Sequence, residues 1–546
     1  PDSTVPTLSA AQRRLWIIEQ MRPGTSAYHI AEAWHFNGAL DHARMRDALT
    51  AVVARHETLR TVFRRDGDEV HAEVRPIEAF NVEFSDVADI ADAESIAAQR
   101  LAICAAEPFN FSAGPLFRAV VIRVAAEHHL VLLVMHHIVS DGWSMELIMR
   151  EFATLHNDGI SALATLPPVT PYRHYAASRA RELAGEAGQN WRQFWRETIG
   201  GERQTLTLPT DFHRPAIMGS RGRVAEIRFP SETFAAMQNV AHSEASTVFM
   251  ALVALVKTLL HHYTGQTDLS VGTPVAGRDR EEWEHTVGFF INTIVLRDQI
   301  DPDADVLTLL RQVRQTTLGA FAHQAYPFDE LVDDLKLERD LSRHPLFDVS
   351  IQHAPRETPP PTLDRLTVIR HEHDQIPLKC DLSFDFGEDA DGLVCGLTYN
   401  PELFTADRIE RLGRHLRTLS AAMFTATDLP LARLPVIDEA ERAQVQQTFA
   451  VGRPLAPATR SLSDCFSATA NTHANQPALI TREITLTYHE LQTQVDDLAL
   501  RLRGSGLQTG DVVGVMVSRG LALPVCLLAV LRAGGIYLPL DSVLPP

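Results

Sequence analysis

Two adjacent histidines, followed by an aspartate and a glycine, are the densest group of chemically capable side chains in this sequence. They are His136, His137, Asp141 and Gly142, in the stretch MHHIVSDGWS that begins at Met135. The unperturbed pKa of histidine is about 6.5, so a neutral imidazole can accept a proton near pH 7. The string therefore predicts a general-base site, at which the chain turns at the aspartate and the glycine lets the backbone approach another group closely.

Two other interpretations of the same string have to be weighed. A histidine at the end of a strand is more often a buried structural residue than a catalyst. Histidine and aspartate also bind metal ions, but neighbouring histidines on a strand chelate poorly, and the string contains no cysteine or third histidine. We therefore expect no metal here.

The elements around the string position its side chains. The run Leu130–Val134 is uninterruptedly apolar, which is typical of a strand buried on both faces. Successive side chains of a strand point to opposite faces, so His136 and His137 cannot enter the same pocket. One should face a cleft, and the other should face the structure behind it. A second strand is predicted at 116–124, and a helix at 145–155.

Other local patterns predict helices and their ends. Ser9 and Asp41 are candidate N-caps, and His56 closes an apolar stripe with helical spacing that begins at Met45, which makes it a core residue rather than a catalyst. A long apolar helix is predicted at 247–263, with Gly265 as its C-cap.

Length and composition limit the function classes. A chain of 546 residues is too long for one core, and 45% hydrophobic with 22% charged residues is typical of a globular protein. The formal charge of −19 argues against nucleic-acid binding. Five scattered cysteines without a CxxC pair indicate a reducing compartment, so we expect a cytoplasmic protein. The longest uncharged apolar segments are shorter than the ~20 residues that a bilayer requires, so we expect no membrane association.

Two proline-rich breaks divide the chain. They are 166–171 and the Pro/Gly-rich segment 450–457. The chain also starts without Met or a signal peptide, and we expect it to be a piece of a longer protein. The expected organisation is an N-terminal lobe at 1–168, a C-terminal lobe at 169–445, a linker at 446–462 and a separate α/β unit at 463–546.

Six short strings between Ser9 and Leu346 carry a resemblance to one family. They are SAAQRRLW (9–16), RHETLRTVF (55–63), MHHIVSDGWS (135–144), GFFINTIVLR (288–297), HQAYPFD (323–329) and RDLSRHPL (339–346). In this order they resemble the signatures of the condensation domains of nonribosomal peptide synthetases. Ala325 and His344 depart from the usual residues, and 172–176 only approximates a further signature. The strings at 486–491 and 531–541 resemble the first two adenylation signatures, without the phosphate loop that follows them in that family.

The resemblance implies a fold and an activity. The fold is α/β (α+β), with two chloramphenicol acetyltransferase-like lobes in a V-shaped pseudo-dimer and a truncated α/β fragment of an adenylation domain. The activity is amide-bond formation, in which an acceptor aminoacyl amine attacks a donor thioester. Both substrates ride on phosphopantetheine arms of upstream and downstream carrier proteins, so the chain binds no cofactor of its own. An adenylation domain follows in cis, but ATP and magnesium would require its complete form, and we expect no amino-acid activation by residues 463–546.

The resemblance also assigns roles to single residues. His137 is the general base or a hydrogen-bond partner of the amine, and backbone N–H groups near Gly142 stabilise the oxyanion. His136 supports the fold, and Asp141 pairs with Arg297. Further supporting residues are Arg60 and Trp143, and the candidates for lining the substrate tunnel are Ser144, Asn292 and Tyr326.

Alternatives within the family stay open. Heterocyclisation domains carry a DxxxxD string in place of the two histidines. This chain has the histidines and no such string there. An epimerisation domain, or a member that recruits partners without catalysis, would keep much of the same sequence. The first signature and residues 28–30 favour the subtype that takes an L-configured donor.

Overall fold

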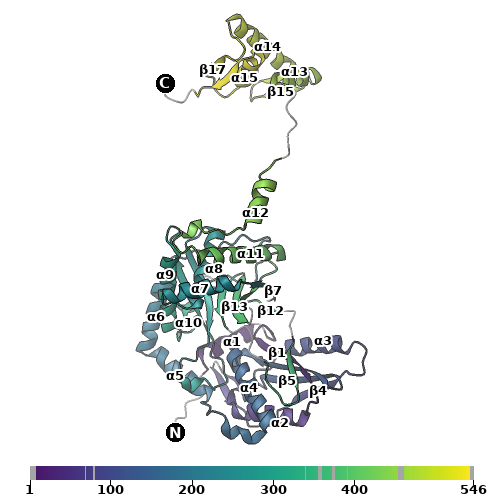
Figure 1. Cartoon of the computed structure of the whole chain (residues 1–546), viewed down its shortest axis with the longest axis vertical. Coiled ribbons are helices and arrows are strands. Elements are labelled where there is room, and N and C mark those ends of the chain that lie inside the picture. Colours follow the sequence, from purple (N-terminus) through teal and green to yellow (C-terminus); the bar gives the residue numbers. More distant parts are fainter. Residues whose placement is uncertain are drawn as a thin grey trace. The chain divides into compact units, whose positions relative to one another are not determined.

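The computed structural model describes residues 8–541 apart from 22, 68, 78–79, 220, 338–339, 355–359, 372–375, 390–391 and 453–459. The chain divides into two compact units after Arg442 (Figure 1). Part of the expected linker, residues 453–459, lies outside the described residues, as does Arg339 of the sixth string. Within the described part of the chain no single helix is long and apolar enough to cross a membrane. Helices α7 (Ser231–Ser243) and α8 (Val248–Thr264) meet that test only as a pair bent by 109°.

The first half of the larger unit is built on a five-stranded sheet in the order β11-β1-β6-β5-β4. Its strands are β1 (His29–Asn37), β4 (Val82–Asp86), β5 (Phe117–Ala125), β6 (His128–His136) and β11 (Thr367–Arg370), and a separate hairpin consists of β2 (Thr61–Asp66) and β3 (Glu69–Val74). The helices are α1 (Ala10–Met21), α2 (His42–Arg55), α3 (Ala93–Ala106) and α4 (Gly142–Asp158). This is the N-terminal lobe.

Strand β6 is buried on both faces, as its uninterrupted apolar run predicts. Val131, Leu133 and Met135 pack with α2 and α4 in one core cluster. Leu130, Leu132 and Val134 pack with α1 and α3 in another. The alternation of its side chains therefore places the two strand-end histidines in different surroundings.

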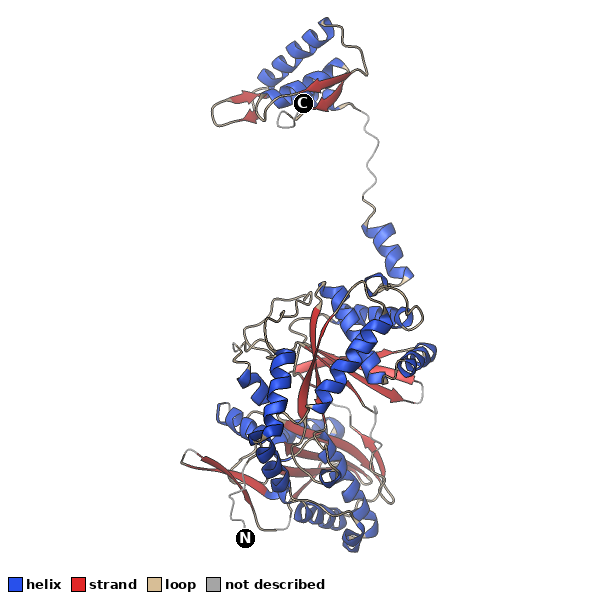
Figure 2. Cartoon of the chain, turned by 90° about the vertical axis from the view of Figure 1, so that its left-hand side faces the viewer, coloured by secondary structure: helices blue, strands red, loops and turns tan. Residues whose placement is uncertain are grey.

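The C-terminal lobe contains a seven-stranded sheet in the order β12-β7-β14-β13-β10-β8-β9. Its strands are β7 (Arg221–Arg228), β8 (Asp268–Val275), β9 (Asn292–Gln299), β10 (Val349–His353), β12 (Ile376–Pro377), β13 (Leu382–Asp389) and β14 (Gly392–Tyr399). The helices are α5 (Tyr172–Ala184), α6 (Glu186–Ile199), α7 (Ser231–Ser243), α8 (Val248–Thr264), α9 (Val306–Ala322), α10 (Phe328–Asp334), α11 (Ala406–Met423) and α12 (Glu439–Gln444). Helices pack against the strands of both sheets (Figure 2).

One strand connects the two lobes. Strand β11 follows β10 of the C-terminal lobe in sequence, yet it pairs antiparallel with β1, with Trp34 opposite Arg370 and Asn37 opposite Thr367. The sheet of the N-terminal lobe is therefore completed by residues from beyond the expected boundary at 168.

Several local predictions are confirmed. Asp41 accepts from the backbone N–H groups of Ala43 and Arg44 and caps α2. Gly265 ends α8 in the left-handed region with φ of 69°, where glycine meets no Cβ penalty. His56 is buried and lies 2.8 Å from Glu151, as expected of a core residue.

The smaller unit has its own core. Its helices are α13 (Leu462–Thr472), α14 (Tyr488–Gly504) and α15 (Ala522–Ala533), and its strands are β15 (Pro477–Ile480), β16 (Thr485–Thr487), β17 (Val512–Val515) and β18 (Ile536–Pro539). Thr487 and Glu490 form a capping box at the start of α14. The apolar faces of α14 and α15 make up most of the core.

Lys257 and Asp298 form an ion pair inside the C-terminal lobe, and it provides a test of the core. Neither side chain is more than 1% exposed, and Lys257 also donates to the Leu296 carbonyl (2.9 Å). Lys257→Met should lower the free energy of unfolding by about 3–5 kcal/mol, because Asp298 then remains buried without its cation. Thermal and denaturant unfolding measure the loss.

The control for this substitution is Arg64→Met, which breaks a half-exposed pair with Glu73. Exposed pairs contribute at most about 1 kcal/mol. Equal losses in the two variants would show that the buried pair does not have the stabilising role assigned to it.

Candidate functional site

The two histidines stand at the end of β6 and differ in surroundings and in hydrogen bonding. His136 is the last residue of the strand, and His137 begins a short 3-10 turn, residues 137–139. The backbone N–H of His137 donates to the Tyr28 carbonyl (2.8 Å), which fixes the turn against β1.

His136 lies inside the N-terminal lobe and is 1% exposed. Its ring packs edge-on against Phe111, with the centroids 4.6 Å apart, and lies near His29 and Phe109. Its Nδ1 accepts from the Ile138 N–H (3.1 Å), so the proton of the neutral ring belongs on Nε2. Burial, with smaller effects of His29 and His137, lowers the pKa of His136 to about 3.

His137 is partly exposed, and its ring lies against Phe289. Its Nδ1 lies 3.1 Å from the Ser140 carbonyl oxygen. A carbonyl only accepts, so Nδ1 carries the proton and Nε2 keeps a free lone pair. Desolvation, together with the positive charge of Lys379, lowers the pKa of His137 to about 4, against the opposing effects of Asp141 and the Ser140 carbonyl. The imidazole is therefore neutral at pH 7.

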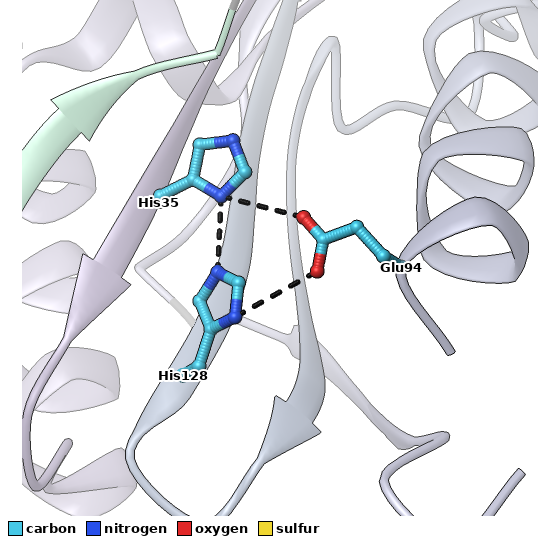
Figure 3. Close-up of side chains that lie close together, drawn as sticks. All are labelled: His35, Glu94 and His128. Atoms are coloured by element: carbon cyan, nitrogen blue, oxygen red, sulfur yellow. Dashed lines mark hydrogen bonds and ion pairs between the residues drawn. The ribbon is translucent and has the colours of Figure 1, made fainter. Parts of the chain in front are cut away.

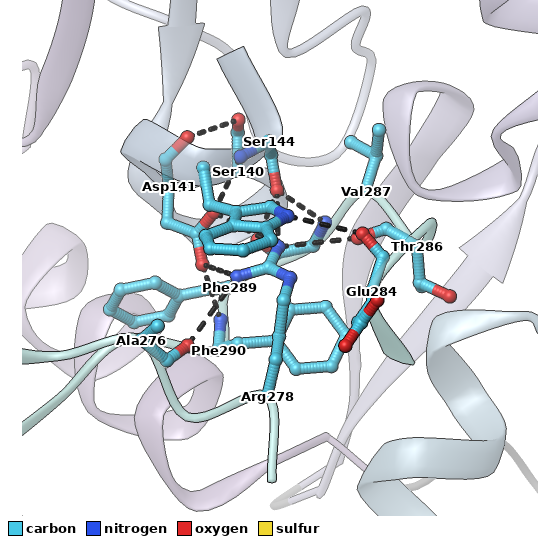
Figure 4. A network of polar contacts seen from close by, with 12 residues as sticks. Ser140, Asp141, Ser144, Ala276, Arg278, Glu284, Thr286, Val287, Phe289 and Phe290 are labelled. Carbon is cyan, nitrogen blue, oxygen red and sulfur yellow. Dashed lines mark hydrogen bonds and ion pairs between the residues drawn. The ribbon is translucent and has the colours of Figure 1, made fainter. Parts of the chain in front are cut away.

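Asp141 forms a buried ion pair with Arg278, and both side chains are 2% exposed. The guanidinium donates to both carboxylate oxygens (2.9 and 3.1 Å) and to the Ser144 hydroxyl (2.9 Å). It lies between aromatic side chains, 4.1 Å from the centroid of the Phe290 ring (Figure 4). The carboxylate also accepts from the Ser144 and Phe290 N–H groups (2.8 and 3.0 Å). Because Arg278 follows β8, this pair joins the two lobes.

The predicted pairing of Asp141 with Arg297 is wrong. Arg297 lies within β9 and pairs with Asp268, to which its Nε and Nη2 each donate at 2.8 Å. It also donates to the Gly200 carbonyl (3.0 Å). Strand register decides this, since Arg297 stands opposite Ser270 on β8 and its side chain reaches the start of that same strand.

Ser144 was expected from the family resemblance to line the substrate tunnel, and this prediction is wrong. Its side chain is completely buried, donates to the Gly288 carbonyl (3.0 Å) and accepts from the Gly288 N–H (3.0 Å). It is a third connection between the lobes. Trp143, a predicted supporting residue, is 45% exposed and donates to the Glu284 carbonyl (3.1 Å).

Gly142 is the first residue of α4, directly after the capping aspartate. A Cβ added there would meet no protein atom within 4 Å, so the fold itself does not require glycine at this position. The backbone N–H groups of the first helical turn have no carbonyl partner within the helix. Together with the positive end of the helix dipole, they favour a negatively charged oxygen nearby.

A small cavity, partly open to solvent, lies between the start of α1, helix α5 and the segment 289–292. Phe289 lines it and also contacts His137. Asn292, a predicted tunnel residue, lines it as well, and its amide holds the carbonyls of Gln324 and Tyr326 (2.8 and 2.7 Å).

Tyr326, expected to line the tunnel, and Arg60, expected to support the site, both lie elsewhere. The side chain of Tyr326 is 2% exposed and bonds to Arg192 and Asp334 inside the C-terminal lobe, so it does not line the cavity. Arg60 donates to the Arg75 carbonyl (2.6 Å) near the β2–β3 hairpin, and none of its described hydrogen bonds reaches the two histidines or Asp141.

Sequence reasoning missed three residues near the site. Arg278 lies in a charged connection without a signature. Gln12 belongs to the first string, and its side chain donates to the Ile138 carbonyl (2.9 Å), so the presence of glutamine in that signature was the available signal. Lys379 is exposed at the surface, yet desolvation of its ammonium group lowers its pKa. Its positive charge in turn lowers the pKa of His137.

Comparison with known proteins identifies the family. The family model "Condensation domain" matches residues 3–446, and the model "AMP-binding enzyme" matches residues 466–546. One component of the linear gramicidin synthase of Brevibacillus parabrevis is 36% identical over 556 aligned residues, which cover 100% of this chain and 7% of that protein. Tyrocidine synthase 3 of Brevibacillus parabrevis is 33% identical, with 98% and 8% covered. The chain thus spans less than a tenth of the length of these relatives.

Solved structures share the fold. A holo four-domain nonribosomal peptide synthetase, AB3403, bound to AMP and glycine, superposes with a TM-score of 0.77 at 23% identity, over 99% of this chain and 42% of that one. The X-domain from teicoplanin biosynthesis superposes with a TM-score of 0.71 at 25% identity, over 80% of this chain and 99% of that one. The chain belongs to the condensation-domain family of nonribosomal peptide synthetases, and a short AMP-binding segment follows that domain.

A double-mutant cycle can test the ion pair between the lobes. Asp141→Ala and Arg278→Ala should each cost about 3–5 kcal/mol of unfolding free energy, because each leaves a buried charge unpaired. The double mutant should cost clearly less than the sum, since the two residues are in contact. Unfolding of the four proteins gives the coupling energy.

Arg297→Ala is the matched control for this cycle. It removes an arginine with a different partner, so its effect should add to that of Asp141→Ala. Coupling of Asp141 to Arg297 that equals or exceeds coupling to Arg278 would contradict the pairing described here.

The influence of Lys379 on His137 can be tested by titration. A nearby cation disfavours the imidazolium, so Lys379→Met should raise the pKa of His137 from its value of about 4. Histidine side-chain NMR follows the titration, with the His137 signal assigned by its loss in His137→Gln. An unchanged or lower pKa in Lys379→Met would exclude the electrostatic effect, and Arg64→Met is a control for the general loss of a positive charge.

Proposed function

We propose that residues 3–446 form an amide bond between two aminoacyl groups that arrive as thioesters. The observation that carries this proposal is the state of His137, a neutral imidazole whose Nδ1 proton is held by the Ser140 carbonyl and whose Nε2 is free. Its contact with Phe289, which also lines the cavity between α1 and the segment 289–292, supports access from that cavity.

The proposed reaction is an acyl transfer. The acceptor amine attacks the carbonyl carbon of the donor thioester, a C–N bond forms, and the tetrahedral intermediate collapses with cleavage of the C–S bond. The nitrogen loses a proton, which His137 Nε2 can accept, and the donor arm leaves as a thiol after protonation. A thioester is already activated, so holding amine and carbonyl in attack geometry contributes much of the rate enhancement.

The oxyanion of the intermediate would be stabilised at the start of α4. The N–H groups of Gly142 and Trp143 would serve, because those of Ser144 and Met145 donate to Asp141, and Gly142 leaves space beside them. Asp141 acts on this site indirectly, because it accepts from the Ser144 N–H and thereby fixes the turn. We assign Asp141, Ser144 and Arg278 to positioning, and His137 with the Gly142 backbone to catalysis.

The substrates and partners follow from the same proposal. The donor and acceptor groups would be carried on phosphopantetheine arms of separate carrier domains, with an adenylation domain in cis from residue 466 onward, in the cytoplasm. An L-configured donor is the proposed subtype, on the basis of the first signature and residues 28–30. The relatives that support a role in nonribosomal peptide synthesis are synthases of linear gramicidin and tyrocidine.

A second candidate function is recruitment without peptide formation. A complex of the teicoplanin X-domain with OxyB has been solved, and that X-domain superposes on this chain with a TM-score of 0.72. The intact pair of histidines with a free Nε2 favours catalysis. An experiment with loaded carriers separates the two candidates.

The deciding experiment mixes this protein with two carriers loaded with chosen aminoacyl groups and measures intact mass. Peptide formation implies a dipeptidyl group on the acceptor carrier and a free thiol on the donor arm. The same measurement with a D-configured donor tests the subtype. Carriers that bind this protein but exchange no mass over a broad set of loaded pairs would favour recruitment.

Substitution of His137 should lower the reaction rate, whereas substitution of His136 should lower the stability of the fold. His137→Ala should keep the melting temperature and slow single-turnover peptide formation by ~10²–10⁴-fold, the usual effect of losing a general base. His136→Ala should lower the melting temperature, because it removes a buried ring packed on Phe111. Unfolding and single-turnover rates are measured side by side, and a wild-type rate in His137→Ala would refute its chemical role.

A further inference from the structure

A cluster of histidines lies at the other end of the strand that carries His136. His128 is the first residue of β6, and His35 lies on the neighbouring strand β1, where it stands opposite Leu130. Eight residues separate His128 from His136 along β6, which corresponds to about 27 Å at ~3.4 Å per residue. The cluster is therefore separate from the catalytic end of the lobe.

Three side chains of this cluster converge on a common point (Figure 3). His35 Nδ1 lies 3.0 Å from His128 Nε2. Glu94, from the first turn of α3, places one carboxylate oxygen 3.7 Å from His35 Nδ1 and the other 3.7 Å from His128 Nδ1. One candidate ligand atom from each residue lies within 4.8 Å of the others, and this is the one such group found in the described part of the chain.

These separations are close to those of a metal centre. Zinc binds imidazole nitrogens and carboxylate oxygens at about 2.0–2.1 Å, which puts the ligand atoms of a tetrahedral site about 3.4 Å apart. The contacts of 3.0 and 3.7 Å lie within a few tenths of an ångström of that value. Two imidazoles and one carboxylate would leave a fourth position for water.

The surroundings of His35 resemble those of a metal-bound histidine. Its second ring nitrogen, Nε2, lies 2.9 Å from Nδ1 of His371. A histidine that binds a metal through one nitrogen almost always donates a hydrogen bond through the other, which fixes its tautomer and orientation. His371 follows β11, and its backbone N–H donates to the Ala33 carbonyl on β1 (2.9 Å).

We propose that His35, His128 and Glu94 form a binding site for a divalent transition-metal ion of the zinc class. The ion would link β1, the start of β6 and the start of α3. Through His371 it would also hold the segment that crosses from the C-terminal lobe. Its role would be structural, because it stabilises the strand pairing on which the sheet of the N-terminal lobe depends, at a distance from His137.

The test uses the full chain without an affinity tag, treated with chelator and dialysed against Zn²⁺. We expect one tightly held Zn²⁺ per chain and a visible absorption band when Co²⁺ replaces it. His128→Gln and Glu94→Gln should each weaken Zn²⁺ binding by at least about tenfold, the order of loss seen even for groups that only support a ligand. Zn²⁺ should raise the melting temperature of the wild type more than that of either variant, because a ligand of the folded state stabilises it.

His71→Gln is the matched control, since His71 also lies near a glutamate, Glu69 at 4.0 Å, but belongs to no group of three candidate ligands among the described residues. It should leave Zn²⁺ binding unchanged. Glu94 is 56% exposed, so Glu94→Gln keeps the test decisive even where a histidine variant does not fold. Wild-type affinity in Glu94→Gln and in a folded His128→Gln, no specific Zn²⁺ binding by the wild type, or an equal loss in His71→Gln would overturn the proposal.

Discussion

The buried ion pair between Asp141 and Arg278 is the interaction on which the rest of the site depends. Removing two charges from water costs several kcal/mol per ion, and the cost is offset only by good geometry and additional hydrogen bonds. Here the guanidinium bonds to both carboxylate oxygens, to Ser144 and to the Thr286 carbonyl. The carboxylate also receives two backbone N–H groups. The pair therefore fixes one relative position of the segments that meet there.

That position determines what lies beside His137. Asp141 caps α4 and, through the Phe290 N–H, holds the segment that precedes β9. The neighbouring residue, Phe289, then lies against the His137 ring, while its carbonyl accepts from the Tyr172 hydroxyl (2.6 Å). Buried residues thus position the one imidazole of the pair that is partly exposed.

The electrostatics of His137 bear on how it acts. A pKa of about 4 keeps the imidazole neutral at physiological pH but makes it a weak base. An activated thioester needs little help beyond correct placement of the amine. A neutral imidazole with a fixed tautomer is therefore suited to orienting the amine by a hydrogen bond at least as well as to removing its proton. The pKa of His136 is lower still, about 3, because burial, His29 and His137 all act in the same direction and no neighbouring group opposes them, which agrees with a structural residue that stays neutral.

The sequence alone determined the local features, because these depend on neighbours in the chain. Asp41 and Gly265 show their roles through short-range hydrogen bonding and backbone conformation, and the run 130–134 shows a strand buried on both faces through composition. The alternation of side chains along that strand separates His136 from His137 without any knowledge of the fold. The family signatures, in order, were enough to predict a condensation domain.

Only the tertiary structure decided which partners the residues of the site have. Arg297 and Arg278 both follow β8 in the sequence. Strand register brings Arg297 to Asp268, and the course of the connection after β8 brings Arg278 to Asp141. Ser144 and Tyr326 sit in signatures, yet their hydrogen bonds direct both side chains into the protein and away from the cavity. His35, Glu94 and His128 are far apart in sequence and meet because β1 pairs with β6 and α3 packs over them. Long-range contacts depend on how the sheets and helices pack, and no local pattern records that packing.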